Sequence, residues 1–231
     1  GERDCSLQRN NQKVLEESPS IAIGKTLRNE IGAAAVRAAK SVGYENAGTI
    51  EFLLDEATGK FYFMEMNTRI QVEHPVTEFV SSVDIVKEQI RIAAGHPLTL
   101  KQEDVVLRGH AIECRINAEN PAFNFAPSPG KIKNLYLPSG GVGLRVDSAV
   151  YPGYTIPPYY DSMIAKVIVH GENRFDALMK MQRALCELEI EGVETNTTFQ
   201  LDLISDSRVI AGDYDTSFLM ETFLPNYQAK K

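Results

Sequence analysis

One segment, residues 61–75 with the sequence FYFMEMNTRIQVEHP, constrains the possible structures of this chain more than any other. Polar and apolar side chains alternate along most of it. The polar side chains occupy the odd positions, Glu65, Asn67, Arg69, Gln71 and Glu73, and the even positions hold Met66, Thr68, Ile70 and Val72. Because successive side chains of an extended backbone point to opposite faces, this alternation predicts an extended segment with one polar face.

The composition of this polar face favours a binding site. A face that is merely solvated usually carries Lys, Ser and Thr, whereas this one holds two carboxylates, two amides and one guanidinium, with no Lys. Carboxylate and amide oxygens are hard ligands that suit Mg²⁺, and an arginine fork suits a planar anion. An amphipathic strand with an ordinary wet face remains the alternative.

The residues before this segment predict a β-hairpin. Two runs rich in β-forming residues, 49–54 and 61–66, are joined by a turn at residues 57–60. Such a hairpin could set Glu51 on the strand beside Glu65, and Asn67 would follow at the same edge. Two carboxylates and an amide on adjacent strands make a metal–phosphate site plausible, although a purely structural hairpin would have the same pattern.

Residues 65–78, EMNTRIQVEHPVTE, resemble the signature of the biotin carboxylase family. These are the ATP-grasp enzymes that carboxylate biotin in acetyl-CoA, propionyl-CoA and pyruvate carboxylases. The resemblance continues through ERDCSLQR near the start, RGHAIECRINAE at residues 108–119 and PPYYDSMIAK at residues 157–166. Other ATP-grasp ligases share the paired metal carboxylates but not the RIQVEHP continuation, so a match of this length is far more specific than a lone Gly-rich motif.

The resemblance implies an α+β fold. Residues 1–104 would form the second half of an ATP-grasp α/β domain, and residues 105–231 a biotin carboxylase C-terminal domain of antiparallel strands and helices. The family's Gly-rich loop and phosphate-contacting lysines lie on a lid that precedes the matching region. We therefore expect the chain to be the C-terminal part of a longer protein, without the N-terminal domain and lid, and to be inactive alone.

The resemblance also implies the metal and nucleotide ligands. It assigns Mg²⁺ or Mn²⁺ on the ATP phosphates to three residues, Glu51, Glu65 and Asn67. Gln8, Asn11 and Lys13 fall in the family's early nucleotide-contacting segment, and Leu53, on the predicted face of Glu51, would pack on the adenine. Asn11 stands where the family usually has His, and an amide cannot carry charge, so a contact there would be weaker. Without the resemblance, Gln8 and Lys13 would be ordinary residues of a solvated strand end.

For bicarbonate and biotin, the resemblance implies a second group of residues. Arg69, Gln71 and the backbone at Val72 would bind bicarbonate, and Glu73 would remove its proton as general base. A base works best with a pKa near ambient pH, whereas the guanidinium of Arg69 beside Glu73 would lower the pKa of that carboxyl, and the sequence leaves this conflict open.

Arg115 matches the family's arginine that stabilises the biotin enolate. From spacing alone, Glu113 and Arg115 are neighbours on one strand face and could equally form a simple surface ion pair. His110, on the opposite face, is predicted to be a core or hydrogen-bonding histidine, because no second His or Cys is spaced for a metal.

Together these assignments imply ATP- and bicarbonate-dependent carboxylation of biotin on the biotin carboxyl carrier protein, through carboxyphosphate. This is the first step of acetyl-CoA carboxylase in fatty acid synthesis. The implied partners are the carrier protein, the carboxyltransferase subunits and a second copy of the chain, with Arg145 at the dimer contact. The alternatives are a non-catalytic dimerisation or assembly module, or the equivalent part of a pyruvate or propionyl-CoA carboxylase. The chain leaves no room for a fused carrier domain after its last predicted helix, which favours a stand-alone subunit.

Bulk properties exclude other classes of protein. The net charge is −7 and no Lys/Arg-rich block occurs, so we expect no nucleic-acid partner. No apolar run approaches the ~20 residues of a membrane helix. The three cysteines are widely spaced and odd in number, which argues against a zinc site or a disulfide framework and favours a reducing compartment. With no apolar secretory signal at the start, a cytoplasmic location is expected.

Periodicity predicts the remaining elements. Helices are expected at residues 24–43, 83–94, 173–188, 197–204 and 217–224, with Asp84 near the start of the second and Asn173 capping the third. A strand is predicted from the alternation in residues 105–120, and another at residues 157–171. The glycines at 140, 141 and 143 precede an alternating strand, so a tight hairpin is favoured over a phosphate-binding loop.

Overall fold

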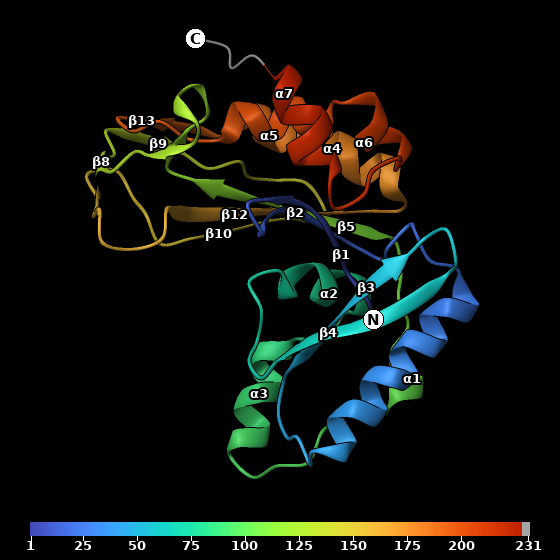
Figure 1. Ribbon diagram of the computed structural model, residues 1–231. Helices are drawn as coiled ribbons and strands as arrows, with labels where there is room; N and C mark the ends of the chain where they lie inside the picture. Colours follow the sequence, from blue (N-terminus) through green and yellow to red (C-terminus); the bar gives the residue numbers. More distant parts are fainter. Residues whose placement is uncertain (228–231) are drawn as a thin grey trace. The chain divides into compact units, whose positions relative to one another are not determined.

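The computed structural model describes residues 1–227, which form two compact units (Figure 1). The first, which we call the hairpin unit, comprises Gly1–Asp4 and Ser18–Arg108. The second, which we call the sheet unit, comprises Cys5–Glu17 and the described chain from Gly109 onward. A short N-terminal segment of the sequence thus belongs with the second unit. The predicted division into family domains at residues 104 and 105 stays a prediction.

The hairpin unit is built on the predicted β-hairpin. Strands β3 (Thr49–Asp55) and β4 (Lys60–Asn67) are antiparallel, and Glu51 lies directly opposite Glu65, so the prediction is confirmed in both strands and register. Its helices are α1 (Lys25–Ser41), α2 (His74–Ser81) and α3 (Ile85–Ala93), followed by the 3₁₀ turn η1 (Gln102–Asp104).

The expected extension of the polar strand to residue 73 is wrong. Strand β4 ends at Asn67, residues 68–73 form bends and a turn, and α2 begins at His74 with Pro75 in its first turn. Proline suits that position because the missing N–H would have no partner inside the helix. Alternation over six residues does not distinguish a strand from a turn that leads into a helix. Consequently Arg69 is exposed while Gln71 and Glu73 are buried.

Two predicted helices of this unit are confirmed. Helix α1 lies within the predicted residues 24–43, and Gly43 follows its end with a φ of +61°, a conformation that favours glycine. Helix α3 begins after Asp84, whose side chain accepts a 2.8 Å hydrogen bond from the backbone N–H of Lys87. That hydrogen bond satisfies a donor that the helix itself leaves unpaired.

The sheet unit contains a five-stranded sheet in the order β1-β2-β5-β12-β10. Its strands are β1 (Asp4–Arg9), β2 (Gln12–Ser18), β5 (His110–Asn117), β12 (Met163–Gly171) and β10 (Leu144–Ser148). Between β1 and β2, Asn10 and Asn11 have φ values of 50° and 62°. A two-residue turn with positive φ at both positions matches the right-handed twist of a hairpin, and asparagine tolerates this conformation.

Helices cover one face of this sheet (Figure 1). They are α4 (Arg174–Glu187), α5 (Thr197–Ile204), α6 (Ser207–Ala211), the π-helix η3 (Phe218–Phe223) and α7 (Leu224–Asn226). The core lies where α4 and α5 meet β5 and β12, and includes Ile112, Cys114, Ile116, Val167, Met181 and Phe199. The predicted helices at residues 173–188 and 197–204 are confirmed, and Asn173 caps α4 by accepting from the Asp176 N–H at 3.0 Å.

Short strand pairs complete the unit. They are β6 (Glu119–Asn120) with β7 (Ala126–Pro127), β8 (Gly130–Lys131) with β11 (Thr155–Ile156), and β9 (Asn134–Tyr136) with β13 (Glu189–Glu191); the 3₁₀ turn η2 (Pro121–Phe123) connects β6 and β7. The α+β class is confirmed. Within residues 1–227, no helix is both long and apolar enough to cross a membrane.

The glycine-rich turn at residues 140–143 is not the predicted hairpin. All three glycines have positive φ and lead into β10, but β10 pairs with β12, whereas the preceding β9 pairs with β13. At Gly143 a Cβ atom would lie 2.3 Å from the carbonyl oxygen of His170. The glycine is therefore needed for close approach to β12, a long-range contact that local spacing did not reveal.

Candidate functional site

The two hairpin carboxylates converge on one amide. Glu51 and Glu65 are directly opposite each other on β3 and β4, and Asn67 lies two residues further along β4. The Nδ2 of Asn67 donates to Oε1 of Glu51 at 3.1 Å and to Oε1 of Glu65 at 2.8 Å. Side chains facing each other across an antiparallel pair are within contact distance, so two carboxylates and an amide form one cluster, in which the amide nitrogen faces both carboxylates.

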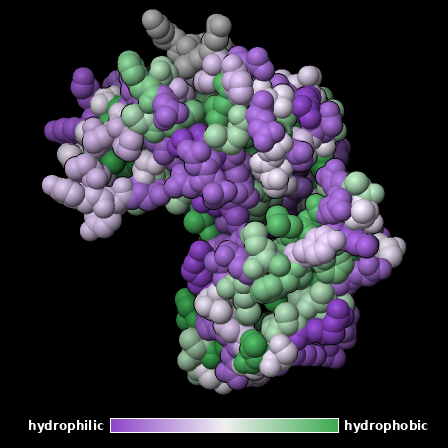
Figure 2. All heavy atoms as spheres, viewed as in Figure 1, coloured by the Kyte–Doolittle hydropathy of each residue, from purple (hydrophilic) through white to green (hydrophobic). Residues whose placement is uncertain are grey.

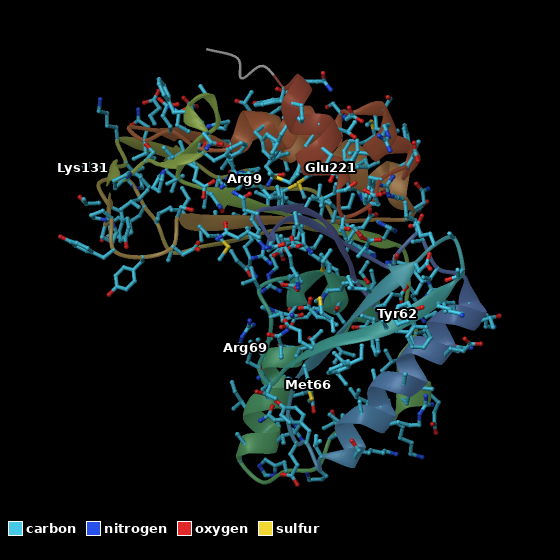
Figure 3. The ribbon with its side chains drawn as sticks, in the orientation of Figure 1. Arg9, Tyr62, Met66, Arg69, Lys131 and Glu221 are labelled. Atoms are coloured by element: carbon cyan, nitrogen blue, oxygen red, sulfur yellow. The ribbon has the colours of Figure 1, made fainter. Side chains whose placement is uncertain are left out.

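A β-bulge shifts the strand register directly beside this cluster. The register shifts after the Glu51 pair, so that Phe52 pairs with Phe63 and Leu53 with Tyr62, leaving Met64 as the extra residue. Leu53 thus lies on the face of Glu51, two residues along β3, and its side chain is 51% exposed. This position suits the predicted adenine contact, which stays a prediction. Tyr62, which is labelled in Figure 3, pairs with Leu53 across the hairpin.

Arg3 donates hydrogen bonds to residues that adjoin this cluster, although no sequence pattern indicated it. Its guanidinium donates to Oε1 of Gln71 at 2.5 Å and to the hydroxyls of Thr49 and Thr77 at 3.0 Å. Gln71 in turn donates from Nε2 to Oε1 of Glu51 at 2.5 Å. Arg3 belongs to the quoted ERDC motif, but its partners lie 46 to 74 residues away in the sequence, so spacing gave no signal for it.

Glu73, the predicted base, is 2% exposed and lies at the N-terminus of α2. A cation beside it is Arg3, whose Nη2 is 4.0 Å from Glu73 Oε1. Arg69 is exposed after the end of β4 (Figure 3), and its Nη1 donates to the carbonyl of Ile70 at 3.1 Å. The backbone of Val72 lies in the turn between these groups. Arg3 is thus a cation near Glu73 that the sequence did not indicate, and the conflict expected between Arg69 and Glu73 stays a prediction.

In the sheet unit, a small pocket brings together Lys13 and Arg115. Its lining also includes Arg9, Gln12, Val14, Asn117, Glu119, Phe125, Asn196 and Phe199. Arg9 is neutralised by Glu119 at 3.3 Å and lies over the ring of Phe125 at 4.3 Å. Gln12 was not among the predicted residues, although it is next to Lys13. The lining holds three cationic side chains and one carboxylate, and Arg115 also pairs with Glu16, which lies outside the lining.

The other two predicted nucleotide residues are placed by the β1–β2 hairpin. The Nε2 of Gln8 donates to the carbonyl of Cys5 at 2.7 Å. Asn11 is exposed in the turn. Its positive φ gives a backbone reason for asparagine at this position, where the family usually has His.

Arg115 forms a largely buried ion pair. Its Nε and Nη2 lie 2.6 Å and 2.5 Å from Oε1 of Glu16 on strand β2, and the Glu16 side chain is 0% exposed. Glu113 is also fully buried and lies 3.9 Å from the Nζ of Lys166. The alternative of a simple surface pair between Glu113 and Arg115 is therefore wrong, because the carboxylate of Glu113 does not reach the surface.

His110 is a hydrogen-bonded core histidine, as predicted. It is 5% exposed, and its Nε2 lies 2.5 Å from Oε2 of Glu17. The same oxygen accepts a hydrogen bond from Nε of Arg174 at 2.7 Å, and Oε1 of Glu17 accepts one from the hydroxyl of Tyr214. Burial alone would raise the pKa of Glu17, but the hydrogen bonds from His110 and Arg174 and the charge of Arg174 outweigh it and lower that pKa to about 2. Glu17 is therefore ionised in the folded chain, where it joins His110, Arg174 and Tyr214.

The candidate metal site of the described chain combines carboxylate and amide side chains. Within residues 1–227 no group of three or more His, Cys, Asp or Glu side chains could hold a metal ion. The hairpin cluster has two carboxylates and one amide. This composition suits a cation such as Mg²⁺, which takes one or two protein carboxylates and completes its shell with water and substrate phosphates.

Comparison with known proteins identifies the family. Residues 113–221 match the biotin carboxylase C-terminal domain, and residues 1–101 match the ATP-binding domain of the carbamoyl-phosphate synthase L chain. Biotin carboxylase 1 of Bacillus subtilis is 61% identical over 223 residues, which cover 96% of this chain and 49% of that protein. Over nearly its whole length, the chain is similar to biotin carboxylases. The resemblance noted in the sequence is thereby confirmed.

Other biotin carboxylase relatives extend the comparison. A pyruvate carboxylase subunit of Methanothermobacter thermautotrophicus is 54% identical over 95% of this chain and 44% of that protein. The biotin carboxylase domain dimer of Hydrogenobacter thermophilus 2-oxoglutarate carboxylase, solved with MgADP, ADP and bicarbonate, is 50% identical with a TM-score of 0.94, over 99% of this chain and 50% of that one. The chain thus spans about half the length of the relatives it matches.

Proposed function

We propose that this chain is the C-terminal part of a biotin carboxylase that carboxylates biotin on a biotin carboxyl carrier protein, using ATP and bicarbonate. The observation that carries the proposal is the convergence of Glu51, Glu65 and Asn67 on one face of the hairpin. Gln71 also donates a hydrogen bond to the carboxylate of Glu51. The 61% identity to a biotin carboxylase supports this chemistry for the cluster.

The hairpin cluster would hold the metal ion. Oxygen atoms of Glu51, Glu65 and Asn67 would ligate Mg²⁺, or Mn²⁺, which would neutralise charge on the ATP phosphates when bound. The ATP itself would also contact Leu53 on this face, and Gln8, Asn11 and Lys13 from the β1–β2 hairpin. The hydrogen bonds that Gln71 and Asn67 donate to Glu51 hold this carboxylate in place before a ligand arrives.

Bicarbonate would bind at the turn before α2. The fork of Arg69, the amide of Gln71 and the backbone of Val72 would contact its oxygens, and Glu73 would take its proton. Bicarbonate would then accept the γ-phosphoryl group of ATP, giving ADP and carboxyphosphate. A guanidinium 4.0 Å away, that of Arg3, favours the ionised carboxylate of Glu73, the form that accepts a proton.

The carboxyl group would reach biotin through CO₂. Carboxyphosphate would break into CO₂ and phosphate, and the phosphate would remove the proton from the ureido N1′ of biotin. Arg115 would stabilise the resulting enolate, whose N1′ then attacks CO₂ to form carboxybiotin. A fixed cation aimed at developing negative charge is worth much more than one that must reorient during the reaction.

The first experiment measures bicarbonate- and biotin-dependent ATP cleavage by this chain alone, and then after addition of the rest of the full-length protein. We expect no turnover by the chain alone and turnover after addition. Turnover by the isolated chain would mean that the ATP site is misplaced. No turnover either by the chain alone or after the addition would favour the alternative of a non-catalytic dimerisation or assembly module.

For the parent system, we propose acetyl-CoA carboxylase in fatty acid synthesis, with the carrier protein, carboxyltransferase subunits and a second copy of the chain as partners. A pyruvate carboxylase is the second candidate, because a subunit of that enzyme is 54% identical; a propionyl-CoA carboxylase remains a further alternative. Supplying the full-length protein with purified carrier and carboxyltransferase from each system, and measuring which acceptor is carboxylated, separates them.

A further inference from the structure

Strand β2 carries two adjacent buried carboxylates, each paired with an arginine. Glu16 and Glu17 are both 0% exposed, and as neighbours in a strand they point to opposite faces of the sheet. Glu17 binds Arg174, His110 and Tyr214. Glu16 binds the side chain that we assign to the biotin enolate. The chain thus contains two similar ion pairs, of which one lies at the candidate site and the other does not.

The contact between Glu16 and Arg115 fixes a guanidinium at two points. The Nε and Nη2 atoms of Arg115 lie 2.6 Å and 2.5 Å from the same oxygen, Glu16 Oε1. Donation from two nitrogens of the planar guanidinium restricts both its position and its rotation. The two residues are 99 positions apart in the sequence, so this restraint exists only in the folded sheet.

The backbone of Arg115 is held separately, by helix α5 and the residue before it. The carbonyl of Arg115 accepts from Nδ2 of Asn196 at 3.0 Å and from Nε2 of Gln200 at 2.9 Å. Gln200 also donates to the carbonyl of Val14 at 2.9 Å, so one amide bridges β2 and β5. These contacts do not involve Glu16. A change at Glu16 would therefore remove one restraint on the guanidinium without removing these backbone contacts.

We propose that Glu16 is a positioning residue that holds the Arg115 guanidinium in the orientation that stabilises the biotin enolate. This inference rests on the proposed function. An arginine side chain has several rotatable bonds, and a donor that is already oriented does not lose this freedom during the reaction. Glu16 acts only through Arg115 and does not touch the reacting atoms.

The test compares Glu16→Gln with Glu17→Gln in the full-length protein, at a temperature at which circular dichroism shows both variants folded. We expect Glu16→Gln to lower kcat for carboxylation of free biotin by about 10- to 100-fold, the scale of a misplaced catalytic group. Its bicarbonate-dependent ATP cleavage without biotin should stay within about twofold of the wild type. Glu17→Gln also loses a buried ion pair, and its kcat should stay within about twofold.

Three further variants distinguish positioning from general loss of structure. In an Arg115→Ala background, Glu16→Gln should cause no further loss of kcat, because the residue through which it acts is gone. Glu17→Gln should have the same small effect in both backgrounds. Glu16→Asp, which keeps the charge, should recover part of the activity lost in Glu16→Gln and also serves if the glutamine variant does not fold.

The outcomes separate this inference from the proposed function. Normal kcat in Glu16→Gln and Glu16→Asp, together with a large loss in Arg115→Ala, would overturn the positioning role and leave the proposed function standing. An equal loss from Glu16→Gln in the wild-type and Arg115→Ala backgrounds would also overturn it. No loss of biotin carboxylation in Arg115→Ala would overturn the proposed role of Arg115 itself, and with it this inference.

Discussion

The two units differ in how completely each buries its own apolar surface. The sheet unit has a continuous core between its sheet and helices. In the hairpin unit, α1 and α3 contain no buried residue, and large side chains on β3 and β4 are exposed: Leu53, Tyr62, Phe63 and Met64. In the view of Figure 2, apolar side chains gather over β4. Exposed apolar patches of this kind mark surfaces that other protein or ligand covers.

Some candidate residues follow the same difference, although Gln71 and Glu73 of the hairpin unit are buried and Asn11 of the sheet unit is exposed. Glu65, Arg69 and Leu53 of the hairpin unit are exposed, whereas Glu16 and most of the Arg115 side chain in the sheet unit are buried. The Glu16–Arg115 contact is thus largely buried within its own unit, whereas Glu65, Arg69 and Leu53 lie at the surface of theirs. The chain covers about half of its relatives, which fits this difference.

The largest expected effect tests the hairpin unit at its most buried candidate. In the full-length protein, Glu73→Gln should lower bicarbonate-dependent turnover by about 10²- to 10⁴-fold, the contribution of a positioned general base, while leaving Mg-ATP affinity nearly intact. Steady-state kinetics and nucleotide titration measure the two quantities. The exposed Glu56→Gln in the β3–β4 turn is the control and should alter neither. Unchanged turnover in Glu73→Gln would remove Glu73 from the mechanism.

The next effect tests the rigid contact of the sheet unit. Arg115→Ala in the full-length protein should reduce biotin carboxylation roughly 100-fold or more, because a fixed charge at the enolate is lost. The variation of rate with biotin concentration separates kcat from KM. A change in biotin KM alone would make Arg115 a binding residue. The burial of its contact with Glu16 would then have no bearing on catalysis.

The pH dependence of the unfolding free energy tests the buried ion pair of Glu17 in the sheet unit. Its pKa is lowered to about 2 in the folded chain from about 4.5, and a depressed carboxyl pKa stabilises the fold above the unfolded value. That contribution, about 3 kcal/mol, should be fully present above pH 4.5 and disappear as the pH falls towards 2. Urea unfolding of the wild type and Glu17→Gln between pH 7 and 2 measures it. Parallel pH dependence of both proteins would contradict the assignment.

The smallest expected effect concerns Arg3 in the hairpin unit. Arg3→Met should cost about 1–3 kcal/mol of unfolding free energy, because it removes donors from Gln71, Thr49 and Thr77. It should also raise the KM for bicarbonate, since Gln71 and Glu73 lose their restraint. Arg28→Met is the control: Arg28 pairs with Glu2 at 2.7 Å, so stability should fall without a change in this KM. Equal KM values in the two variants would leave Arg3 with a structural role only.

Features governed by neighbours in the sequence were predicted well. The β3–β4 hairpin and the pairing of Glu51 with Glu65 followed from β-rich runs around a turn. Helix α4 and its cap at Asn173 followed from periodicity and a polar residue at its start. The family resemblance was likewise readable from contiguous motifs. Each of these signals spans fewer than about 20 residues, the range over which local geometry relates spacing to structure.

Features that depend on distant contacts were not predicted. Alternation suggested a strand as far as Glu73, but the structure has a turn and then α2, so Glu73 lies buried near Arg3. Spacing left open a surface ion pair between Glu113 and Arg115, whereas Glu113 is buried and the folded sheet supplies Glu16 from another strand.

The sequence by itself determined the β3–β4 hairpin, the pairing of Glu51 with Glu65 and the cap of α4, because local spacing and side-chain chemistry govern these features. The tertiary structure alone decided which charges meet: Arg3 with Gln71, and Glu16 with Arg115. The physical reason is that burial makes an unpaired charge costly, so each buried charge must find its partner wherever the fold brings one, regardless of distance along the chain.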